Sequence, residues 1–250
     1  MRAMVLAAGL GTRLRPLTLA TPKPLVEVAG RPMIHYALDL VRNAGILDVA
    51  INLHHLGDQL RAALGDGSAL GLRITYFAED PILDTGGGIA AARSFLDGDR
   101  FVVLNSDTIT DVDLGALIEA HRAQGATATM MLRPDPDAAR YGVIEIDEAQ
   151  RIRRFLGIPA PDFDSDAEAN LQALMFGGVH VFEPRVFAYM GTGAFSITRE
   201  TYPRMLAAGE PLCGFIHAGF WQVLDTPGGL EAGREAVGRH FPRRSTATSQ

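Results

Sequence analysis

The sequence predicts an α/β protein with a Rossmann-like, doubly wound sheet and a smaller antiparallel extension. Short β-rich runs alternate with amphipathic helical patterns through the first half of the chain, as in proteins built from βαβ units. The first of these runs leads directly into a glycine-rich turn. The rhythm then changes in the second half, where strand patterns follow one another without a full helix between them. Together these observations predict a mixed sheet.

Each element of the first half has its own pattern. Apolar runs predict strands at 4–7, 49–53, 72–77 and 101–104. Apolar residues at helical spacing predict helices with faces over 34–41, 60–64, 89–96 and 114–121. We expect Pro32 to open the first helix, Gly45 to stop it, and the glycines at 86–88 to open the third.

The second half, after about Met131, predicts strands at 142–146, 152–156 and 175–182. The segment 159–172 is rich in Pro, Asp and Ala, which is typical of a mobile loop. Residues 230–240 predict a terminal helix, and 243–250 a disordered tail. We expect one domain over 1–242.

Composition excludes several functions. The net charge of -6 argues against broad nucleic-acid binding, which requires Lys and Arg over an extended surface. Cys213 is the only cysteine, so an internal disulfide is impossible, and we interpret it as a small packed residue. The apolar run that begins the chain is interrupted by Gly9, Gly11 and Arg13 before it reaches signal-peptide length, and no stretch approaches the roughly 18 apolar residues of a spanning helix. We expect a cytoplasmic protein without a membrane segment.

The strongest motif is LAAGLGTRLRPLT at residues 6–18, followed by PKPL at 22–25. Gly9 and Gly11 let backbone N–H groups approach an anionic ligand, while Arg13 and Lys23 supply positive charge for a triphosphate. The motif lacks the Gly-Lys-Ser/Thr ending of a P-loop and the third glycine of the dinucleotide fingerprint. It therefore predicts a phosphate cradle of another type.

Asp107 follows the predicted strand at 101–104, at the end where open α/β sheets bind ligands. A carboxylate at this edge suits a divalent metal, although a turn or helix-cap role is an alternative. The further motifs are TGGG at 85–88, LNSD at 104–107, YGVI at 141–144, FGGV at 176–179 and WQVLDTP at 221–227.

In their order, these motifs resemble the sugar-1-phosphate nucleotidyltransferase family, which includes mannose-1-phosphate guanylyltransferases and N-acetylmuramate-1-phosphate uridylyltransferases. The resemblance implies that a nucleotidyl group passes from a nucleoside triphosphate to a sugar 1-phosphate and that pyrophosphate leaves. It implies Mg²⁺ as cofactor, a nucleotide-binding half over 1–132 and a sugar-phosphate half over 133–242. A monomer or small homo-oligomer is expected.

The resemblance also implies roles for single residues. The catalytic residues would be Arg13, Lys23 and Asp107. The nucleotide would contact Leu6, Ala7, Ala8, Gly9, Gly11, Thr12, Arg13, Glu79, Thr85, Gly86 and Ser106. The sugar would contact Tyr141, Gly142, Gly178 and Trp221, and the metal Asp107 and Asp225.

Two positions depart from the family pattern. Where the family has Glu-Lys-Pro, with a lysine for the sugar phosphate, this chain has GIP at 157–159. Arg153 or Arg154 is a candidate replacement, and both also fit solvated strand residues. In the family segment Trp-x-Asp-x-Gly-Thr-Pro, Val223 occupies the place of the metal-binding Asp. Asp225 lies two residues further on, about 6.6 Å along an extended strand, and a small register shift would bring it into the site.

The base is predicted to be guanine or uracil. Glu79 stands where the family reads the base edge, and its carboxylate suits the two adjacent N–H donors of guanine, which favours GTP and mannose-1-phosphate guanylyltransferase activity. A solvated Glu79 at a strand end is the alternative, and the TGGG run also resembles the uridylyltransferase branch. A second functional hypothesis is a regulatory protein that binds sugar nucleotides without turnover.

Overall fold

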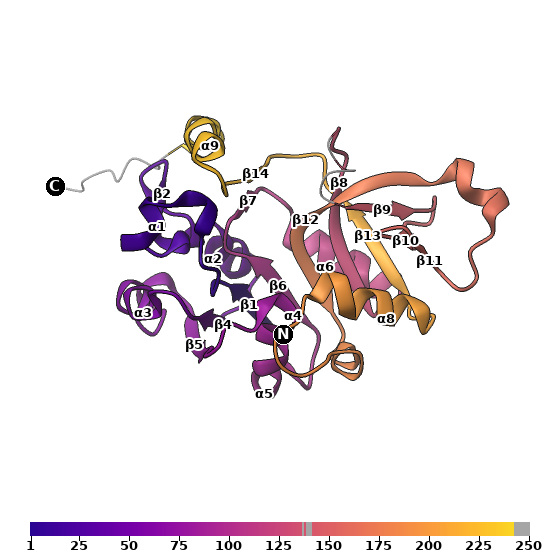
Figure 1. The fold of residues 1–250 in the computed structure, drawn as a ribbon, viewed down its shortest axis with the longest axis horizontal. Helices are drawn as coiled ribbons and strands as arrows, with labels where there is room; N and C mark the ends of the chain where they lie inside the picture. Colours follow the sequence, from indigo (N-terminus) through magenta and orange to yellow (C-terminus); the bar gives the residue numbers. More distant parts are fainter. Residues whose placement is uncertain (137, 139–141, 243–250) are drawn as a thin grey trace.

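A mixed sheet forms the centre of the molecule in the computed structural model, which describes residues 1–136, 138 and 142–242 and, for 165–167, the backbone alone. Over these residues the main sheet has 10 strands in the order β11-β10-β9-β12-β6-β1-β4-β5, with β8 beside β12 and β13 beside β8 (Figure 1). The predicted tail at 243–250 and Tyr141 lie outside the described residues.

The parallel part of the sheet comes from the first half of the chain. Its strands are β1 (Arg2–Leu6), β4 (Asp48–Leu53), β5 (Arg73–Ala78) and β6 (Phe101–Asn105). β1 lies between β4 and β6 and is parallel to both, and β5 continues the sheet beyond β4. Side chains along β1 alternate between the two faces: Met4 joins one buried cluster, while Ala3 and Val5 join the other.

Helices cover both faces. The helices are α1 (Leu17–Ala20), α2 (Ile34–Asn43), α3 (Gly57–Leu64), α4 (Asp84–Ala91), α5 (Arg93–Leu96), α6 (Leu114–Ala123), α8 (Tyr202–Ala207) and α9 (Pro227–His240). On the face of Ala3 and Val5, α2, α3 and α6 contribute their apolar sides. On the face of Met4, α4, α5 and α8 do the same. The predicted doubly wound α/β class with a mixed sheet is confirmed.

The second half adds strands to the main sheet whose pairings are antiparallel, except that the last of them is parallel to the first. They are β8 (Ala128–Arg133), β9 (Val143–Ile146), β10 (Ile152–Phe155), β11 (Ile158–Pro159), β12 (Gln172–Phe182) and β13 (Leu212–Ile216). β12 is antiparallel to β6, β8 and β9, so it joins the extension to the parallel part. Cys213 in β13 is buried, and burial raises the pKa of its thiol to about 11, as expected for a packed residue.

Two small sheets complete the fold. β2 (Glu27–Val28) pairs with β3 (Arg31–Pro32), and β7 (Thr108–Thr110) pairs with β14 (Trp221–Val223). A third buried cluster packs beneath α9, with Leu14 and Val26 from the glycine-turn region, Ile109 from β7, and Leu230 and Val237 from α9 itself. The late segment of the chain therefore closes over its beginning.

Three local predictions were wrong. Pro32 lies in β3, and its helix begins only at Ile34. The glycines at 86–88 lie inside α4 and are buried, because a neighbouring loop and two polar side chains occupy the space that side chains would need. The segment 159–172 is partly regular, since β11 ends at Pro159, a 3₁₀ helix runs over Ser165–Asn170 and β12 begins at Gln172.

Candidate active site

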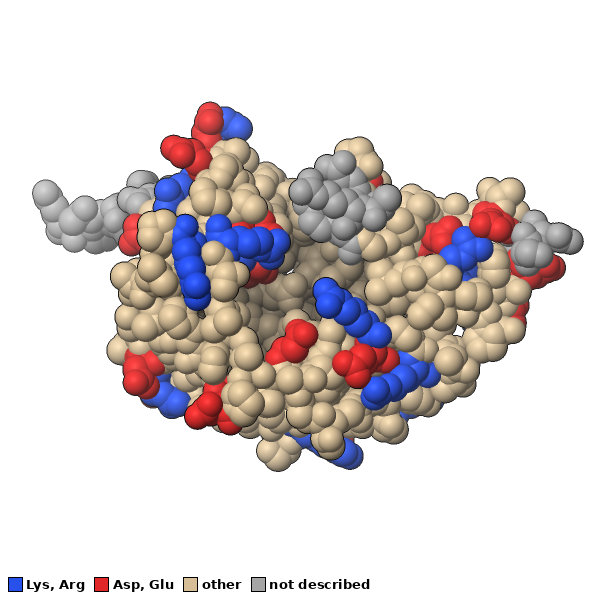
Figure 2. Space-filling model, viewed as in Figure 1, with Lys and Arg blue, Asp and Glu red and all other residues tan. Residues whose placement is uncertain are grey.

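A cavity of about 540 Å³ opens at the carboxyl ends of β1, β4 and β6. This is the edge at which open α/β sheets bind ligands. Figure 2 shows acidic and basic side chains intermingled over one face of the molecule around a central hollow. The cavity is lined by Leu6, Ala7, Ala8, Gly9, Gly11, Thr12, Arg13, Lys23, Pro24, Asn52, Glu79, Ile82, Asp84, Thr85, Asn105, Ser106, Asp107, Ala194 and Asp225.

The glycine-rich turn forms one wall. Gly11 has a left-handed backbone with φ +60°, and a Cβ there would lie 2.9 Å from Cγ2 of Thr18. The Thr18 hydroxyl donates a hydrogen bond of 2.8 Å to the Gly11 carbonyl, which holds the turn against the short helix α1. A Cβ on Gly9 would meet no atom within 4 Å. Gly11 is therefore required by the turn, and Gly9 leaves the backbone open to the cavity.

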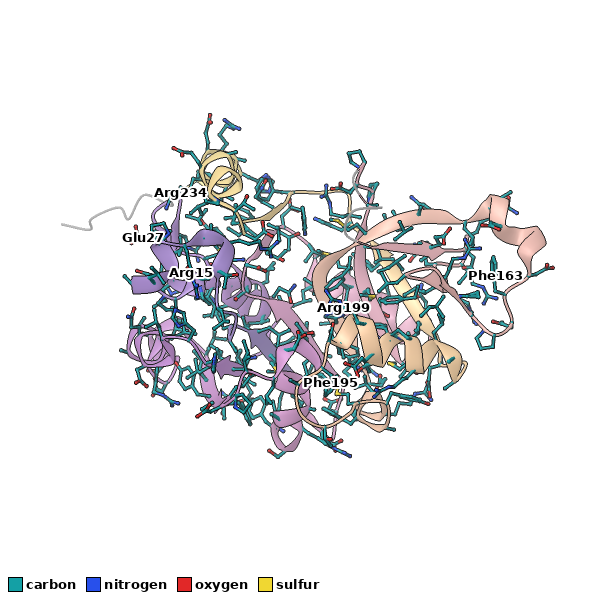
Figure 3. The ribbon with its side chains drawn as sticks, in the orientation of Figure 1. Arg15, Glu27, Phe163, Phe195, Arg199 and Arg234 are labelled. Carbon is teal, nitrogen blue, oxygen red and sulfur yellow. The ribbon has the colours of Figure 1, made fainter. Side chains whose placement is uncertain are left out.

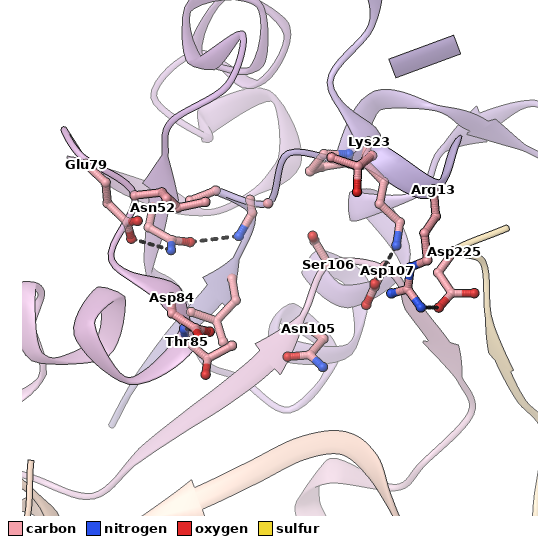
Figure 4. Close-up of a pocket in the computed structure, with 18 of the residues that line it drawn as sticks. Arg13, Lys23, Asn52, Glu79, Asp84, Thr85, Asn105, Ser106, Asp107 and Asp225 are labelled. Atoms are coloured by element: carbon pink, nitrogen blue, oxygen red, sulfur yellow. Dashed lines mark hydrogen bonds and ion pairs between the residues drawn. The ribbon is translucent and has the colours of Figure 1, made fainter. Parts of the chain in front are cut away.

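Two ion pairs cross the cavity wall (Figure 4). Lys23 Nζ lies 2.6 Å from Asp107 Oδ2, and Arg13 Nη1 lies 2.6 Å from Asp225 Oδ2. The Lys23 pair is mostly buried, whereas the Arg13 side chain is 66% exposed. Both predicted phosphate cations thus lie beside a predicted metal-binding carboxylate, in one group at the same end of the cavity.

Pairing of β14 with β7 places Asp225 in this group. Val223 lies opposite Thr108, and the Leu224 amide donates a 3.3 Å hydrogen bond to the Asp107 carbonyl. Leu224 is buried in the core, and the chain then leaves the strand before α9 begins. Asp225 lines the cavity, while Val223 is absent from its wall. Asp225 therefore lies at the cavity, and both its metal binding and the register shift stay predictions.

A buried polar network forms the opposite end of the cavity. Asn52 Oδ1 accepts a 2.7 Å hydrogen bond from the Ala7 amide, and Asn52 Nδ2 donates one of 2.7 Å to Glu79 Oε1. Glu79 Oε2 accepts from the Leu83 amide at 2.9 Å. Our sequence interpretation missed Asn52, whose signal was a single amide within the otherwise apolar run at 49–53.

Glu79 is only 4% exposed, so the alternative that it is a solvated charge was wrong. Both of its carboxylate oxygens accept hydrogen bonds from the protein. What Glu79 does directly is hold Asn52 and the turn at Leu83 in place. A contact between Glu79 and a base stays a prediction.

The glycines of α4 accommodate a loop from the second half of the chain. The Gly86 amide donates to the Phe195 carbonyl at 2.9 Å, and a Cβ on Gly86 would lie 2.3 Å from the Phe195 ring (Figure 3 labels Phe195). The Thr85 hydroxyl accepts a 3.0 Å hydrogen bond from the Ile197 amide, and Ala194 reaches the cavity wall. Thr85 lines the cavity and Gly86 does not.

The predicted sugar contacts do not line this cavity where they are described. Gly178 has φ +91°, and a Cβ there would lie 2.4 Å from the Thr108 hydroxyl, so packing against β7 accounts for it. Trp221 Nε1 donates a 2.9 Å hydrogen bond to the Gly177 carbonyl, and the guanidinium of Arg133 covers its ring. Gly142 has φ +102°, next to Leu156. Their contact with a sugar stays a prediction.

The candidate replacements for the missing lysine have partners already. Arg153 forms an ion pair of 3.1 Å with Asp162. Arg154 pairs with Glu145 at 3.0 Å and with Glu168 at 2.9 Å, and these contacts raise the pKa of its guanidinium. Neither arginine lines the cavity. The structure therefore favours the interpretation of both as structural residues of the extension.

The fold and the cavity define an α/β protein with a ligand-sized cavity at the carboxyl ends of its parallel strands, and the chain belongs to the nucleotidyl transferase family, whose sequence profile matches residues 2–229. Among its relatives, the chain is 37% identical over 227 residues to a mannose-1-phosphate guanylyltransferase of Mycobacterium tuberculosis, covering 90% of this chain and 61% of that protein. It is 32% identical over 225 residues to a UTP–glucose-1-phosphate uridylyltransferase of Synechocystis, covering 84% and 56%.

Solved structures agree with this fold. A Bacillus anthracis protein assigned as a glucose-1-phosphate thymidylyltransferase, in complex with sucrose, matches with a TM-score of 0.82 and 26% identity over 98% of this chain and 97% of that chain. The chain spans about three fifths of the length of the curated relatives named above. Among the described residues, no helix has both the length and the apolar character needed to cross a membrane.

Proposed function

We propose that this protein transfers a nucleotidyl group from GTP or UTP to a sugar 1-phosphate and releases pyrophosphate. The observation that carries the proposal is the cavity at the carboxyl ends of β1, β4 and β6, which has two cations and two carboxylates at one end and a buried polar network at the other. Such a polarised site suits a nucleotide, with its phosphates at the charged end. The named activities of the family relatives support it.

The proposed reaction needs no nucleophilic side chain. An oxygen of the sugar phosphate attacks the α-phosphorus in line, a new P–O bond forms, and the bond to pyrophosphate breaks. The protein contributes positioning and charge neutralisation. Lys23 is mostly buried, so we assign it to the α-phosphate or the incoming sugar phosphate. The exposed Arg13 at the rim is assigned to the departing phosphates.

The donor set fits Mg²⁺. Asp107 and Asp225 supply hard carboxylate oxygens in one group, and both would hold the metal. No group of three or more His, Cys, Asp or Glu side chains suited to a metal occurs among the described residues, so water and phosphate oxygens would complete the coordination. When bound, Mg²⁺ supplies charge neutralisation on the triphosphate. Since each carboxylate pairs with a cation in the structure, we expect metal and phosphates to redistribute these pairs.

The decisive experiment is a panel of nucleoside triphosphates and sugar 1-phosphates with Mg²⁺, read out as pyrophosphate release. We expect turnover with GTP or UTP and at least one sugar 1-phosphate. Binding of sugar nucleotides without turnover by any pair would favour the regulatory hypothesis. The buried single cysteine, Cys213, supports the cytoplasmic setting that this chemistry implies.

Within that experiment, Asp107→Ala tests the proposed charge arrangement. The change removes one of two carboxylates assigned to the metal and also the partner of Lys23. We expect pyrophosphate release to fall by at least about a hundredfold, as removal of a group that stabilises transition-state charge commonly does. Retention of most activity in a folded variant would contradict the metal assignment.

A further inference from the structure

We infer that Asp84 reads the nucleobase and selects guanine over uracil by accepting its N–H donors. The inference rests on the proposed function, because it assigns one end of the same cavity to the base. It concerns a residue at the first position of α4, directly before the glycine run.

Asp84 differs from the other carboxylates of the cavity. Four carboxylates line the described part of its wall: Glu79, Asp84, Asp107 and Asp225. Asp107 and Asp225 pair with cations, and both oxygens of Glu79 accept protein hydrogen bonds. Asp84 is exposed, and within the described part of the chain no cation pairs with it. Among the described residues, the Asp84 carboxylate accepts one hydrogen bond, which the Thr85 amide donates to Oδ1 at 2.6 Å.

The place of Asp84 in the cavity assigns it to the base. In Figure 4, Asp84 and Thr85 lie on the side of Asn52 and Glu79, away from Lys23, Arg13 and their partners. A triphosphate would occupy the cationic end, and an unpaired carboxylate would repel it from the other end. A base carries no negative charge and offers N–H donors along its edge. Asp84 is therefore suited to the base and not to a phosphate.

The backbone of Asp84 is held in an unusual conformation. Its φ is +59°, in the left-handed region that favours glycine, although Asp tolerates this region better than most residues. Two backbone hydrogen bonds to Phe195 hold the residues on either side of Asp84. The Phe195 amide donates to the Leu83 carbonyl at 3.1 Å, and the Phe195 carbonyl accepts from the Gly86 amide. A strained residue that the surroundings hold in place often belongs to a functional site. Here the fixed backbone limits where the carboxylate can reach.

The chemistry of the two bases then decides the preference. Guanine presents N1–H and N2–H side by side, which match the two oxygens of one carboxylate. Uracil presents a single N3–H between two carbonyl oxygens, so a carboxylate that accepts from N3–H also faces a repelling oxygen. A site built on paired hydrogen bonds rejects a base that lacks one of them. Asp84 should therefore favour GTP.

The test compares wild type with Asp84→Asn, which keeps the shape and the tolerance for positive φ but replaces one acceptor oxygen with a donor. We expect wild-type kcat/KM to be higher with GTP than with UTP, and the ratio of the two to fall by about 10- to 100-fold in the variant. Asp80→Asn is the matched control, because Asp80 is exposed nearby and does not line the cavity. It should leave the ratio unchanged.

Calorimetric titration of GTP and UTP separates this inference from the proposed function. A protein that binds GTP more tightly than UTP, and loses this preference with Asp84→Asn, supports the inference even if no sugar 1-phosphate is turned over. Wild-type preference for UTP, or a preference that survives Asp84→Asn, overturns it while leaving nucleotidyl transfer intact. A wild type that binds neither nucleotide overturns both.

Discussion

At the scale of single residues, the role of a carboxylate in the cavity depends on its binding partners. Asp225 is the carboxylate whose role differs most between the two functional hypotheses, an active transferase and a regulatory protein that binds sugar nucleotides without turnover. Asp225→Asn removes its charge and its ion pair with Arg13 but keeps its shape. If Asp225 holds the metal, kcat should fall on the order of a hundredfold and activity should depend more steeply on Mg²⁺ concentration. Pyrophosphate release measured over a range of Mg²⁺ concentrations tests this expectation.

The control for Asp225→Asn is a carboxylate introduced at residue 223, where the family pattern has its metal-binding Asp. Val223→Asp in the wild-type background should change the rate little, because Val223 does not line the cavity. In the Asp225→Asn background, Val223→Asp should restore activity only if the end of β14 moves so that the new carboxylate reaches the cavity. Near-normal kinetics of Asp225→Asn alone would show that this residue serves only the turn before α9.

A second residue-scale prediction concerns His180, which is fully buried in β12 and shares a 2.8 Å hydrogen bond with the Tyr202 hydroxyl. Burial lowers the pKa of His180 from 6.5 to about 3. Below pH 6.5 the imidazole of His180 takes up a proton in the unfolded chain but stays neutral in the folded protein. The free energy of unfolding is therefore undiminished above pH 6.5 and decreases as the pH falls from 6.5 toward the folded-state pKa. The loss should approach about 2–3 kcal/mol by pH 4.5.

Urea unfolding between pH 7 and pH 4.5 measures this loss. Burial also lowers the pKa values of His35 and His121, so both add to the loss in the same direction. His180→Asn should reduce the slope of stability against pH, while Tyr202→Phe should retain it because the imidazole stays buried. Equal slopes in wild type and His180→Asn would refute the prediction.

At the scale of elements, the contact between α4 and the loop at 193–195 joins the two halves of the chain beside the cavity. Gly87→Ala would place a Cβ 2.3 Å from the Gly193 carbonyl oxygen, and a backbone atom there cannot turn away as a side chain can. We expect the variant to lose about 1–3 kcal/mol of stability and to bind nucleotide more weakly, since Ala194 would move. Urea unfolding and nucleotide titration measure the two effects.

Gly228→Ala is the matched control, because a Cβ at this position in α9 meets no atom within 4 Å. Alanine in a helix is favoured over glycine, so the control should be neutral or slightly stabilising. If Gly87→Ala behaved like Gly228→Ala, the loop contact would not explain the glycine run.

At the scale of the whole molecule, α9 links the end of the described chain to its beginning. Thr226 caps α9 by accepting a 3.2 Å hydrogen bond from the Gly229 amide, and Arg234 Nε donates to the Glu27 carbonyl at 3.1 Å (Figure 3 labels Glu27 and Arg234). Leu230 and Val237 fill the third buried cluster. Since Asp225 directly precedes this helix, α9 also anchors one side of the cavity.

Leu230→Ala tests that anchoring. Truncation of a buried leucine commonly costs about 2–5 kcal/mol, and Leu230 is 5% exposed. We expect urea unfolding to show a decrease of this size in the free energy of unfolding, and we expect the variant to inactivate at a lower temperature than wild type. Glu231→Ala, on the exposed side of α9, should change stability by less than about 0.5 kcal/mol. Similar stabilities of the two variants would mean that α9 is dispensable to the fold.

The sequence by itself determined the α/β class, the order of the first strands and helices, and the glycine turn with Arg13 and Lys23. These features follow from local patterns, because hydrophobic period and backbone freedom are properties of neighbouring residues. The family motifs share this property, since each is a short run in the chain. The position of Asp107 at a strand end followed in the same way.

Only the tertiary structure decided which distant residues meet. Pairing of β14 with β7 brings Asp225 to the cavity wall, and contact with the Phe195 loop explains the glycines of α4. The buried link from Asn52 to Glu79 joins residues 27 positions apart. The physical reason is that sheet register and close packing depend on segments far apart in the chain, and no local pattern records the partner that a side chain will find.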